Sequence, residues 1–470
     1  MLSVQNGNIV KVNGDPVYLR GVCAGGYMNM EDFINSMPGV EHTLKYLFRR
    51  ELGADKCEYI FESMMDRFIT ERDIAYIKSL GVNVIRLPLN YHHFEDDDRP
   101  FQYKRRGFDR LDWIIGQCEK KDIYLILDLH AAAGYQNTDW HCDNASRRSM
   151  FWSTPHFQER FYSLWEAIAE HCRDRSAVAG YNLMNEPMSE AELGRLPTPY
   201  KPNWDALNSV YRTTVERIRK VDSEHIIFLE GDLFSTLFSG LDEPFAENLV
   251  YSGHNYSKAG WRAPYPGSIN GEYWDSKKIA KEFLEHESVQ FCRRYNAPLW
   301  VGEFGGGSAP GHLNVFLDQI RAFDNFKAHW TCWTYKDSGS MGVVRLSPEC
   351  EYFERLRHVL ARHEKCGARP VNINRARLTR ELEKVAELTH ACVSAEEFDS
   401  ESNIPFMLSA FDDSYYNSLL QPIFVREFKS MSYTEIDRLM SSFLLENCVP
   451  YAYAGILKKR LGGAGHATEV

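Results

Sequence analysis

The chain has 470 residues, of which 44% are hydrophobic and 25% charged, and this composition is typical of a globular protein with a large core. The formal net charge of −11 argues against non-specific binding of nucleic acid, because such binding depends on Lys and Arg side chains that neutralise phosphates. The sequence contains no run of about 18 apolar residues, so we expect no membrane span.

The first residues and the cysteines bear on the cellular compartment of the protein. Residues 1–7 contain no basic patch followed by an apolar run, which favours a cytoplasmic protein, with a secreted mature form as the alternative. The 11 cysteines are odd in number and scattered, without a C-x-x-C pair. This pattern indicates free thiols in a reducing compartment.

The chain begins with turn signals and continues with alternating helices and strands. The dipeptide Asn6-Gly7 predicts a hairpin, and Thr70-x-x-Asp73 predicts a helix start. Eight apolar runs are predicted strands: residues 17–21, 82–87, 123–130, 178–185, 225–230, 249–254, 299–303 and 328–333. Continuous apolar strands that alternate with helices indicate a parallel sheet buried on both faces. We therefore predict an α/β fold, a (β/α)8 TIM barrel.

Two connections are long, residues 22–69 after the first strand and 131–156 after the third. Loops that follow strands lie on the C-terminal face of a barrel, where active sites form. We expect these loops to wall the site with Trp140 and Trp152. Trp261 and Tyr265, in the loop after the sixth strand, are expected to add another side.

The barrel is complete by about residue 362, so we predict a catalytic barrel at 1–362 and a helical extension at 363–470. The extension has helical patterns at Leu378, Leu382 and Val385, and again behind Thr434-x-x-Asp437. It lacks a linker rich in Gly, Ser or Pro, which favours packing on the barrel.

Polar or aromatic side chains recur at the C-terminal ends of the predicted strands. Each one alone is explained by an ion pair or a satisfied buried histidine, but several in register indicate an active site. The set comprises Arg86, His130, Asn185, Glu186, His254, Glu303 and Trp333.

Two of these residues, Glu186 and Glu303, are glutamates on different strands. Hydrolysis of a glycosidic bond needs two carboxyl groups, one that protonates the leaving oxygen and one that attacks or activates water. The two roles require different pKa values, which His254, Tyr256 and Arg86 can provide. Glu230, at the end of the fifth strand, is the main rival carboxylate.

The run Leu183-Met184-Asn185-Glu186-Pro187 resembles the Asn-Glu-Pro signature of glycoside hydrolase family 5. The resemblance implies that Glu186 is the general acid/base and that Asn185 binds the sugar 2-hydroxyl. The segment 300–305 resembles the nucleophile strand of the family, which implies that Glu303 is the nucleophile.

Further positions agree with the same family in order along residues 15–362. His254-Asn255-Tyr256 resembles its His-x-Tyr motif, whose tyrosine donates to the nucleophile. His130, Arg86 and Trp333 match its third-strand histidine, second-strand arginine and stacking tryptophan. Segments 20–27 and 128–137 resemble the exo-β-1,3-glucanase and β-glucosidase branch, which usually carries Trp where Tyr27 stands.

We therefore predict a retaining β-glycoside hydrolase that cleaves β-linked glucans or gluco-oligosaccharides by double displacement. The alternatives are a hydrolase of the same family directed to β-mannans, mannosides or glycolipids, and a catalytically inactive barrel that binds glycans or a protein. The long loops favour a pocket and release of single sugars from chain ends. No cofactor is expected.

No catalytic metal is expected either. The sequence has no H-x-H on the first strand and no H-E-x-x-H, and the adjacent His92 and His93 cannot both face one metal on a strand.

Overall fold

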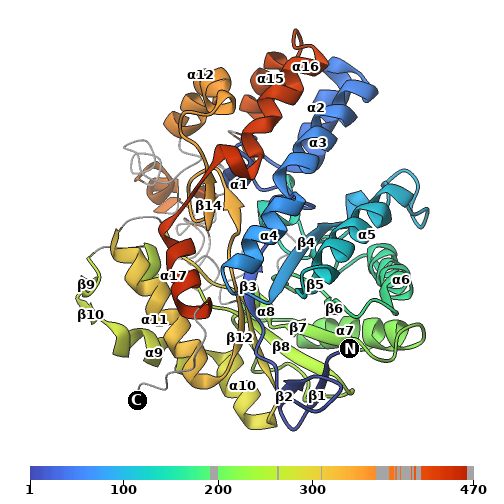
Figure 1. Ribbon diagram of the computed structural model, residues 1–470, viewed down its shortest axis with the longest axis vertical. Helices are drawn as coiled ribbons and strands as arrows, with labels where there is room; N and C mark the ends of the chain where they lie inside the picture. Colours follow the sequence, from blue (N-terminus) through green and yellow to red (C-terminus); the bar gives the residue numbers. More distant parts are fainter. Residues whose placement is uncertain are drawn as a thin grey trace.

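Eight parallel strands close into a barrel at the centre of the molecule (Figure 1). The computed structural model describes residues 1–190, 200–261, 264–307, 310–366 and 417–462, with short stretches between 380 and 415. The strands pair in chain order: β3 (Arg20–Cys23), β4 (Val84–Asn90), β5 (Tyr124–Ala131), β6 (Val178–Asn182), β7 (Ile226–Glu230), β8 (Leu249–His254), β11 (Leu299–Glu303) and β12 (His329–Cys332). The predicted (β/α)8 barrel is confirmed, although β3 begins three residues later and β6 ends three residues earlier than the apolar runs indicate.

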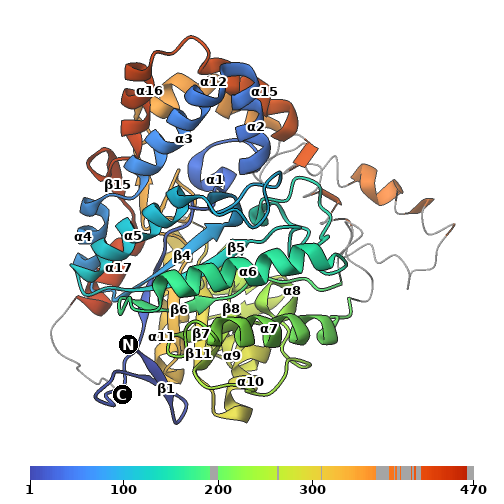
Figure 2. The same ribbon diagram turned by 90° about the vertical axis from the view of Figure 1, so that its right-hand side faces the viewer.

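Helices follow the strands and cover the outside of the barrel (Figures 1 and 2). They are α4 (Glu71–Ser79), α5 (Arg105–Glu119), α6 (Pro155–Cys172), α7 (Trp204–Arg219), α8 (Asp232–Ser235), α9 (Ser276–Glu285), α10 (Glu287–Tyr295) and α11 (Pro310–Phe326). The predicted start at Thr70 is confirmed, because Thr70 and Asp73 form a reciprocal capping box.

Alternate residues of each strand point to opposite sides of the barrel wall. Val84, Ile126, Phe228 and Trp300 belong to the cluster inside the barrel. Their neighbours along the strands, among them Ile85, Leu127, Leu229 and Val301, pack against the helices outside. Burial on both sides explains why the strands are continuous apolar runs in the sequence.

The amino-terminal hairpin closes one end of the barrel. It consists of β1 (Ser3–Gln5) and β2 (Asn8–Val10), and Leu2 and Ile9 pack into the inner cluster. Asn6 and Gly7 both have positive φ, 50° and 74°, as the predicted two-residue turn requires.

The first long loop is helical and packs against the end of the chain. It contains α1 (Asp32–Asn35), α2 (Glu41–Leu52) and α3 (Ala54–Phe68), which lie beside α12 (Glu351–Cys366), α15 (Asn417–Glu427) and α16 (Tyr433–Met440) in both views (Figures 1 and 2). Phe48 packs edge-on against Phe428, with ring centroids 5.2 Å apart. The Tyr59 hydroxyl donates to Asp437 at 2.6 Å. Residue 362 falls inside α12.

The carboxyl-terminal segment differs in two details from the sequence expectation. Helix α16 begins behind Ser432, which forms a capping box with Glu435, and not at the predicted Thr434-x-x-Asp437 box. A strand without a strong sequence signal, β15 (Cys448–Pro450), pairs with β14 (Val344–Leu346), which pairs with β13 (Lys336–Asp337). Helix α17 (Ala452–Leu461) follows. Leu378 lies outside the described residues.

Short elements complete the described chain. They are the 3-10 helices η1 (Tyr91–His93), η2 (Trp140–Cys142), η3 (Lys258–Trp261), η5 (Ser441–Phe443) and η6 (Leu445–Asn447), and the hairpin of β9 (Gly267–Ile269) and β10 (Glu272–Trp274). Across the described parts of the chain, no helix has both the length and the apolar character that crossing a membrane needs.

Candidate active site

Strand alternation carries polar side chains into the upper end of the barrel. Val84 and Ile126 face inward, so Arg86 and Asp128, two positions further along β4 and β5, face the same side. Arg86 has no exposed surface, and its Nη2 atom lies 3.1 Å from Asp128 and 3.2 Å from Glu230. A buried guanidinium requires such carboxylates, because an unpaired charge in the interior is strongly unfavourable.

A β-bulge directs Glu303 into the same space. The pairing of β11 with β8 shifts register between Val301 and Glu303, which places Glu303 opposite His254. Gly302 is required at the bulge, since a Cβ atom there would lie 2.7 Å from Ser252 Oγ and 3.0 Å from His254 Nε2.

The Glu303 carboxylate is held on both oxygens. Arg86 Nη1 donates to Oε1 at 2.5 Å, and the Tyr256 hydroxyl donates to Oε2 at 2.8 Å. Burial alone would raise the pKa of Glu303, but the positive charges of His254 and Arg86 outweigh it and lower this pKa. Glu303 is therefore ionised at neutral pH, as a nucleophile must be.

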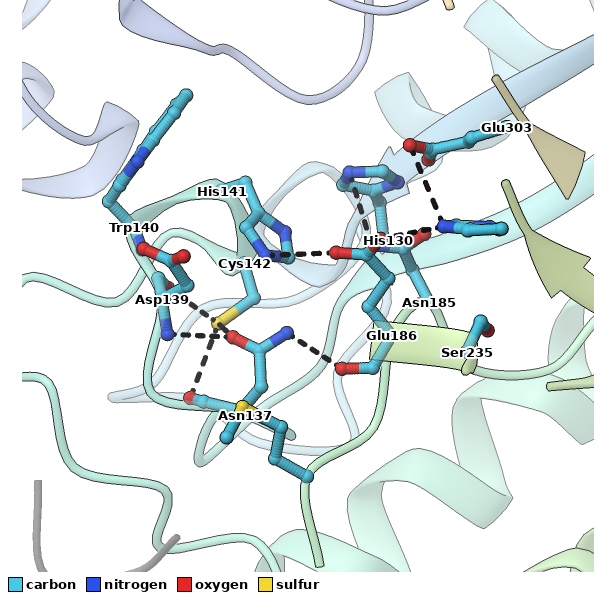
Figure 3. Close-up of polar contacts among 12 residues, drawn as sticks. His130, Asn137, Asp139, Trp140, His141, Cys142, Asn185, Glu186, Ser235 and Glu303 are labelled. Carbon is cyan, nitrogen blue, oxygen red and sulfur yellow. Dashed lines mark hydrogen bonds and ion pairs between the residues drawn. The ribbon is translucent and has the colours of Figure 1, made fainter. Parts of the chain in front are cut away.

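Glu186 lies four residues beyond the end of β6 in a strained backbone conformation, with φ of 48°. Its backbone N–H donates to Glu230 at 2.8 Å, and its carbonyl accepts from Asn137 Nδ2 at 2.9 Å (Figure 3). These contacts come from β7 and from the loop after β5, so distant segments hold the strained residue in place.

Two histidines contact the carboxyl group of Glu186. His254 Nδ1 lies 2.6 Å from Oε1, and His141 Nε2 lies 3.2 Å from Oε2 (Figure 3). Burial would lower the pKa of His254, but the carboxylates of Glu230 and Glu303 raise it well above its usual range. His254 is therefore a cation between the two predicted catalytic glutamates.

The spacing of the two glutamates limits the chemistry. One carboxylate oxygen of Glu186 and one of Glu303 lie within 4.8 Å of each other. Retaining glycosidases have carboxyl groups about 5–5.5 Å apart, whereas inverting enzymes separate them by about 6.5–9.5 Å to admit a water. The observed spacing fits the retaining geometry.

Glu230, the rival carboxylate, is fully buried and enclosed by donors. It contacts Arg86, His254, the Glu186 backbone N–H and the Ser235 hydroxyl. Burial would raise the pKa of Glu230, but His254 and Arg86 lower it to about 2. A carboxylate without exposed surface that two cations hold ionised is poorly placed to act as the acid/base.

His130 and Trp333 form one side of the site. Their rings stack with a centroid distance of 5.3 Å and an interplanar angle of 9°. His130 also contacts Asp128 at 2.8 Å and Asn185 at 3.3 Å. Burial would lower the pKa of His130, but Asp128 raises it to about 10, so this ring is also cationic.

The eight predicted site residues are thus brought together around the two glutamates. Two further residues at the site were missed by sequence reasoning. Glu31, in the first long loop, lies 3.4 Å from His130 Nε2 and is buried. His141, in the second, reaches Glu186. A single sequence contains no local signal for either residue, because a loop path is set by tertiary packing.

The four aromatic residues expected in the walls have different surroundings. Trp140 packs edge-on against Phe33 of the first loop, and the Trp152 indole donates to the Gln136 carbonyl. Trp261 is half-exposed, 6.5 Å from Tyr256 between ring centroids. Tyr265 differs from the expectation, since it is buried in a separate apolar cluster with its hydroxyl bonded to Asp318.

A barrel with two carboxylates at this spacing on its C-terminal face defines a glycosidase of the retaining type. The chain belongs to glycosyl hydrolase family 5: residues 52–339 match the family described as Cellulase (glycosyl hydrolase family 5). It is therefore a retaining β-glycoside hydrolase, as the sequence predicts.

The chain is similar to named proteins over different shares of its length. A protein named Beta-xylosidase from Phanerodontia chrysosporium is 33% identical over 468 residues, covering 95% of each chain. A Probable glucan 1,3-beta-glucosidase A from Emericella nidulans is 27% identical and covers 69% of this chain and 86% of its own. A solved structure titled as an endogalactoceramidase shares the fold, with a TM-score of 0.53, 18% identity and coverage of 72% and 75%.

Proposed function

We propose that Glu303 is the nucleophile and Glu186 the general acid/base of a double-displacement reaction. The observation that carries the proposal is the spacing of at most 4.8 Å between oxygens of the two carboxyl groups. Such a gap leaves no room for the water that an inverting enzyme places between nucleophile and sugar.

In the first step a Glu303 oxygen forms a bond to the anomeric carbon while the bond to the leaving oxygen breaks. The proton of Glu186 passes to that oxygen. In the second step the Glu186 carboxylate takes a proton from water, whose oxygen bonds to the anomeric carbon. Glu303 then leaves as a carboxylate, and the anomeric configuration is retained.

The neighbours divide into groups that act on the carboxylates and groups that meet the sugar. Arg86 is fully buried, so we assign it to keeping Glu303 ionised, together with Tyr256 and His254. Trp333 retains a little exposed surface and stacks on His130, and we assign to it the apolar face of the first-bound sugar. Asn185 is assigned to the sugar 2-hydroxyl.

The substrate we propose is a short β-linked oligosaccharide, cleaved at its chain end. Two long loops support this proposal, because Glu31 and His141 extend from them to the residues around the glutamates. Segments 20–27 and 128–137 favour glucose as the sugar, because they resemble the exo-β-1,3-glucanase and β-glucosidase branch of the family. Xylose is the second candidate, because the relative similar over nearly the whole chain is named Beta-xylosidase.

Covalent trapping tests the mechanism. A 2-deoxy-2-fluoroglycoside with a good leaving group should add one sugar mass to the peptide that contains Glu303. Aryl β-glucoside, β-xyloside and β-mannoside rates then assign the sugar, and the products of a hexasaccharide over time assign exo action. Labelling of Glu230, or an inverted first product, would reject the nucleophile assignment. Early products of mixed length would reject exo action.

A further inference from the structure

A second group of potential ligands lies outside the catalytic site. His42 is at the start of α2, His92 is in η1 after β4, and Asp143 directly follows η2. One nitrogen from each histidine and one Asp143 oxygen all lie within 4.8 Å of one another. Three segments of the wall region, separated by about 50 residues each in sequence, therefore meet at one carboxylate.

The three side chains lie close together, but the two histidine nitrogens form no well-aligned hydrogen bond with Asp143. His42 Nδ1 lies 3.1 Å from Asp143 Oδ1, and His92 Nε2 lies 3.9 Å from Oδ2. Both nitrogens are buried, and neither has a hydrogen-bond partner of good geometry among the described residues. Buried polar atoms are normally satisfied, so two buried nitrogens that lie near one buried carboxylate without a well-aligned hydrogen bond point to a missing ligand.

The distances suit a small cation with modest adjustment. Two ligands that are each about 2.0–2.1 Å from a tetrahedral Zn²⁺ lie roughly 3.3 Å apart. The two distances to Asp143 bracket that value. The carboxylate is already oriented, because Oδ2 accepts from Asn90 Nδ2 at 2.9 Å and Oδ1 from the His42 backbone N–H at 3.1 Å. Such outer contacts are typical of metal ligands.

The site borders a cavity, and its side chains are of the types that bind transition metals. His42 and His92 line a cavity of about 700 Å³, with Asp97 on its wall. Two imidazoles and one carboxylate favour Zn²⁺ and related transition metals, whereas Mg²⁺ and Ca²⁺ prefer oxygen ligands. We propose that His42, His92 and Asp143 bind one divalent metal ion of the zinc class, with the fourth position open to the cavity.

The proposal changes the sequence expectation for His92 and His93, which lie in η1 and not on a strand. His92 faces Asp143, while His93 Nε2 lies 3.4 Å from Glu41. A bound ion would join the first long loop, η1 and the loop of η2. His141, which contacts Glu186, is two residues from Asp143, so the ion would stiffen the segment that carries it.

Calorimetric titration of the EDTA-treated full chain with Zn²⁺ tests the site. We expect one ion per chain and a rise of a few degrees in Tm with Zn²⁺ in excess. His92→Gln should weaken binding by at least about tenfold and abolish the rise in Tm, because one ligand is lost. The matched control His171→Gln removes a surface histidine paired with Asp112 and should bind as the wild type does.

The catalytic group of Glu186, His254 and Glu303 is the competing site, because its ligand atoms also lie within 4.8 Å. Glu303→Gln should retain the Zn²⁺ affinity of the wild type. Binding that Glu303→Gln abolishes and His92→Gln leaves unchanged would overturn the proposal, as would no binding at millimolar Zn²⁺. A wild-type Tm of His92→Gln in EDTA ensures that a loss of binding is not a loss of fold.

Discussion

Replacing Glu186 with glutamine removes the proposed acid/base proton and changes little else. A glutamine oxygen can still accept from His254 Nδ1, which lies 2.6 Å from Glu186 Oε1. Its amide can still donate to His141 Nε2, 3.2 Å from Oε2. The backbone contacts to Glu230 and Asn137 are unaffected. We therefore expect a folded variant whose loss is confined to proton transfer.

The magnitude follows from what a positioned acid contributes. General acid catalysis is worth roughly 100- to 10,000-fold, which corresponds to about 2.7–5.4 kcal/mol of transition-state stabilisation. Glu186→Gln should lose this factor in kcat/KM on oligosaccharides, whose leaving alcohols need a proton. With 2,4-dinitrophenyl glycosides the first step should be nearly unchanged, because that leaving group departs without protonation.

The assay is kcat/KM across aryl glycosides of graded leaving-group pKa, with azide added to replace the base of the second step. Glu230→Gln is the comparison. Because Glu230 is a buried partner of Arg86 and His254, we expect a lower Tm and a similar loss of rate on every leaving group. Steep leaving-group dependence in Glu230→Gln, with normal oligosaccharide turnover in Glu186→Gln, would refute the assignment.

Three further outcomes follow. Tyr256→Phe removes a 2.8 Å hydrogen bond to the Glu303 carboxylate, worth about 1.5–3 kcal/mol, so kcat/KM should fall roughly 10- to 150-fold; an unchanged rate would contradict this role. In the wild type the pKa of Glu303 is lowered, so the acidic limb of the kcat/KM–pH profile should lie below the usual range of a carboxyl group. In Tyr256→Phe this limb should move to higher pH, because the hydrogen bond that helps to lower the pKa of Glu303 is lost. Asp437→Asn weakens contacts with Tyr59 and Arg67 across α16 and α3; after screening at this half-exposed site we expect about 1–2 kcal/mol lost from the free energy of unfolding, with kcat unchanged, and a wild-type Tm would count against it.

The barrel and its catalytic face could be predicted because barrel strands have a local signature. Each strand is buried on both sides, so it is an apolar run that one sequence reveals. The polar residues that interrupt these runs at their ends, such as Arg86, His254 and Glu303, necessarily meet at one face once eight strands close. The family motif then assigned Glu186 and Glu303 before their spacing was known.

Element boundaries in the carboxyl-terminal segment were harder to predict, because two cap patterns overlap there. Ser432 with Glu435 and Thr434 with Asp437 both satisfy the capping pattern. Asp437 instead accepts hydrogen bonds from Tyr59 and Ser63 of α3, so Ser432 caps the helix, which begins at Tyr433. The edge strand β15 likewise depends on β14, which lies about 100 residues earlier in the chain.

The sequence by itself therefore determined the barrel and the order of its strands, and it singled out the two glutamates that we propose as catalytic, because these depend on periodicity and local motif. Tertiary structure alone decided which loop residues reach them. Glu31, His141 and the group of His42, His92 and Asp143 come together only through loop paths, and a path is set by distant packing. The same holds for the surroundings of Glu230, which is fully buried between Arg86 and His254.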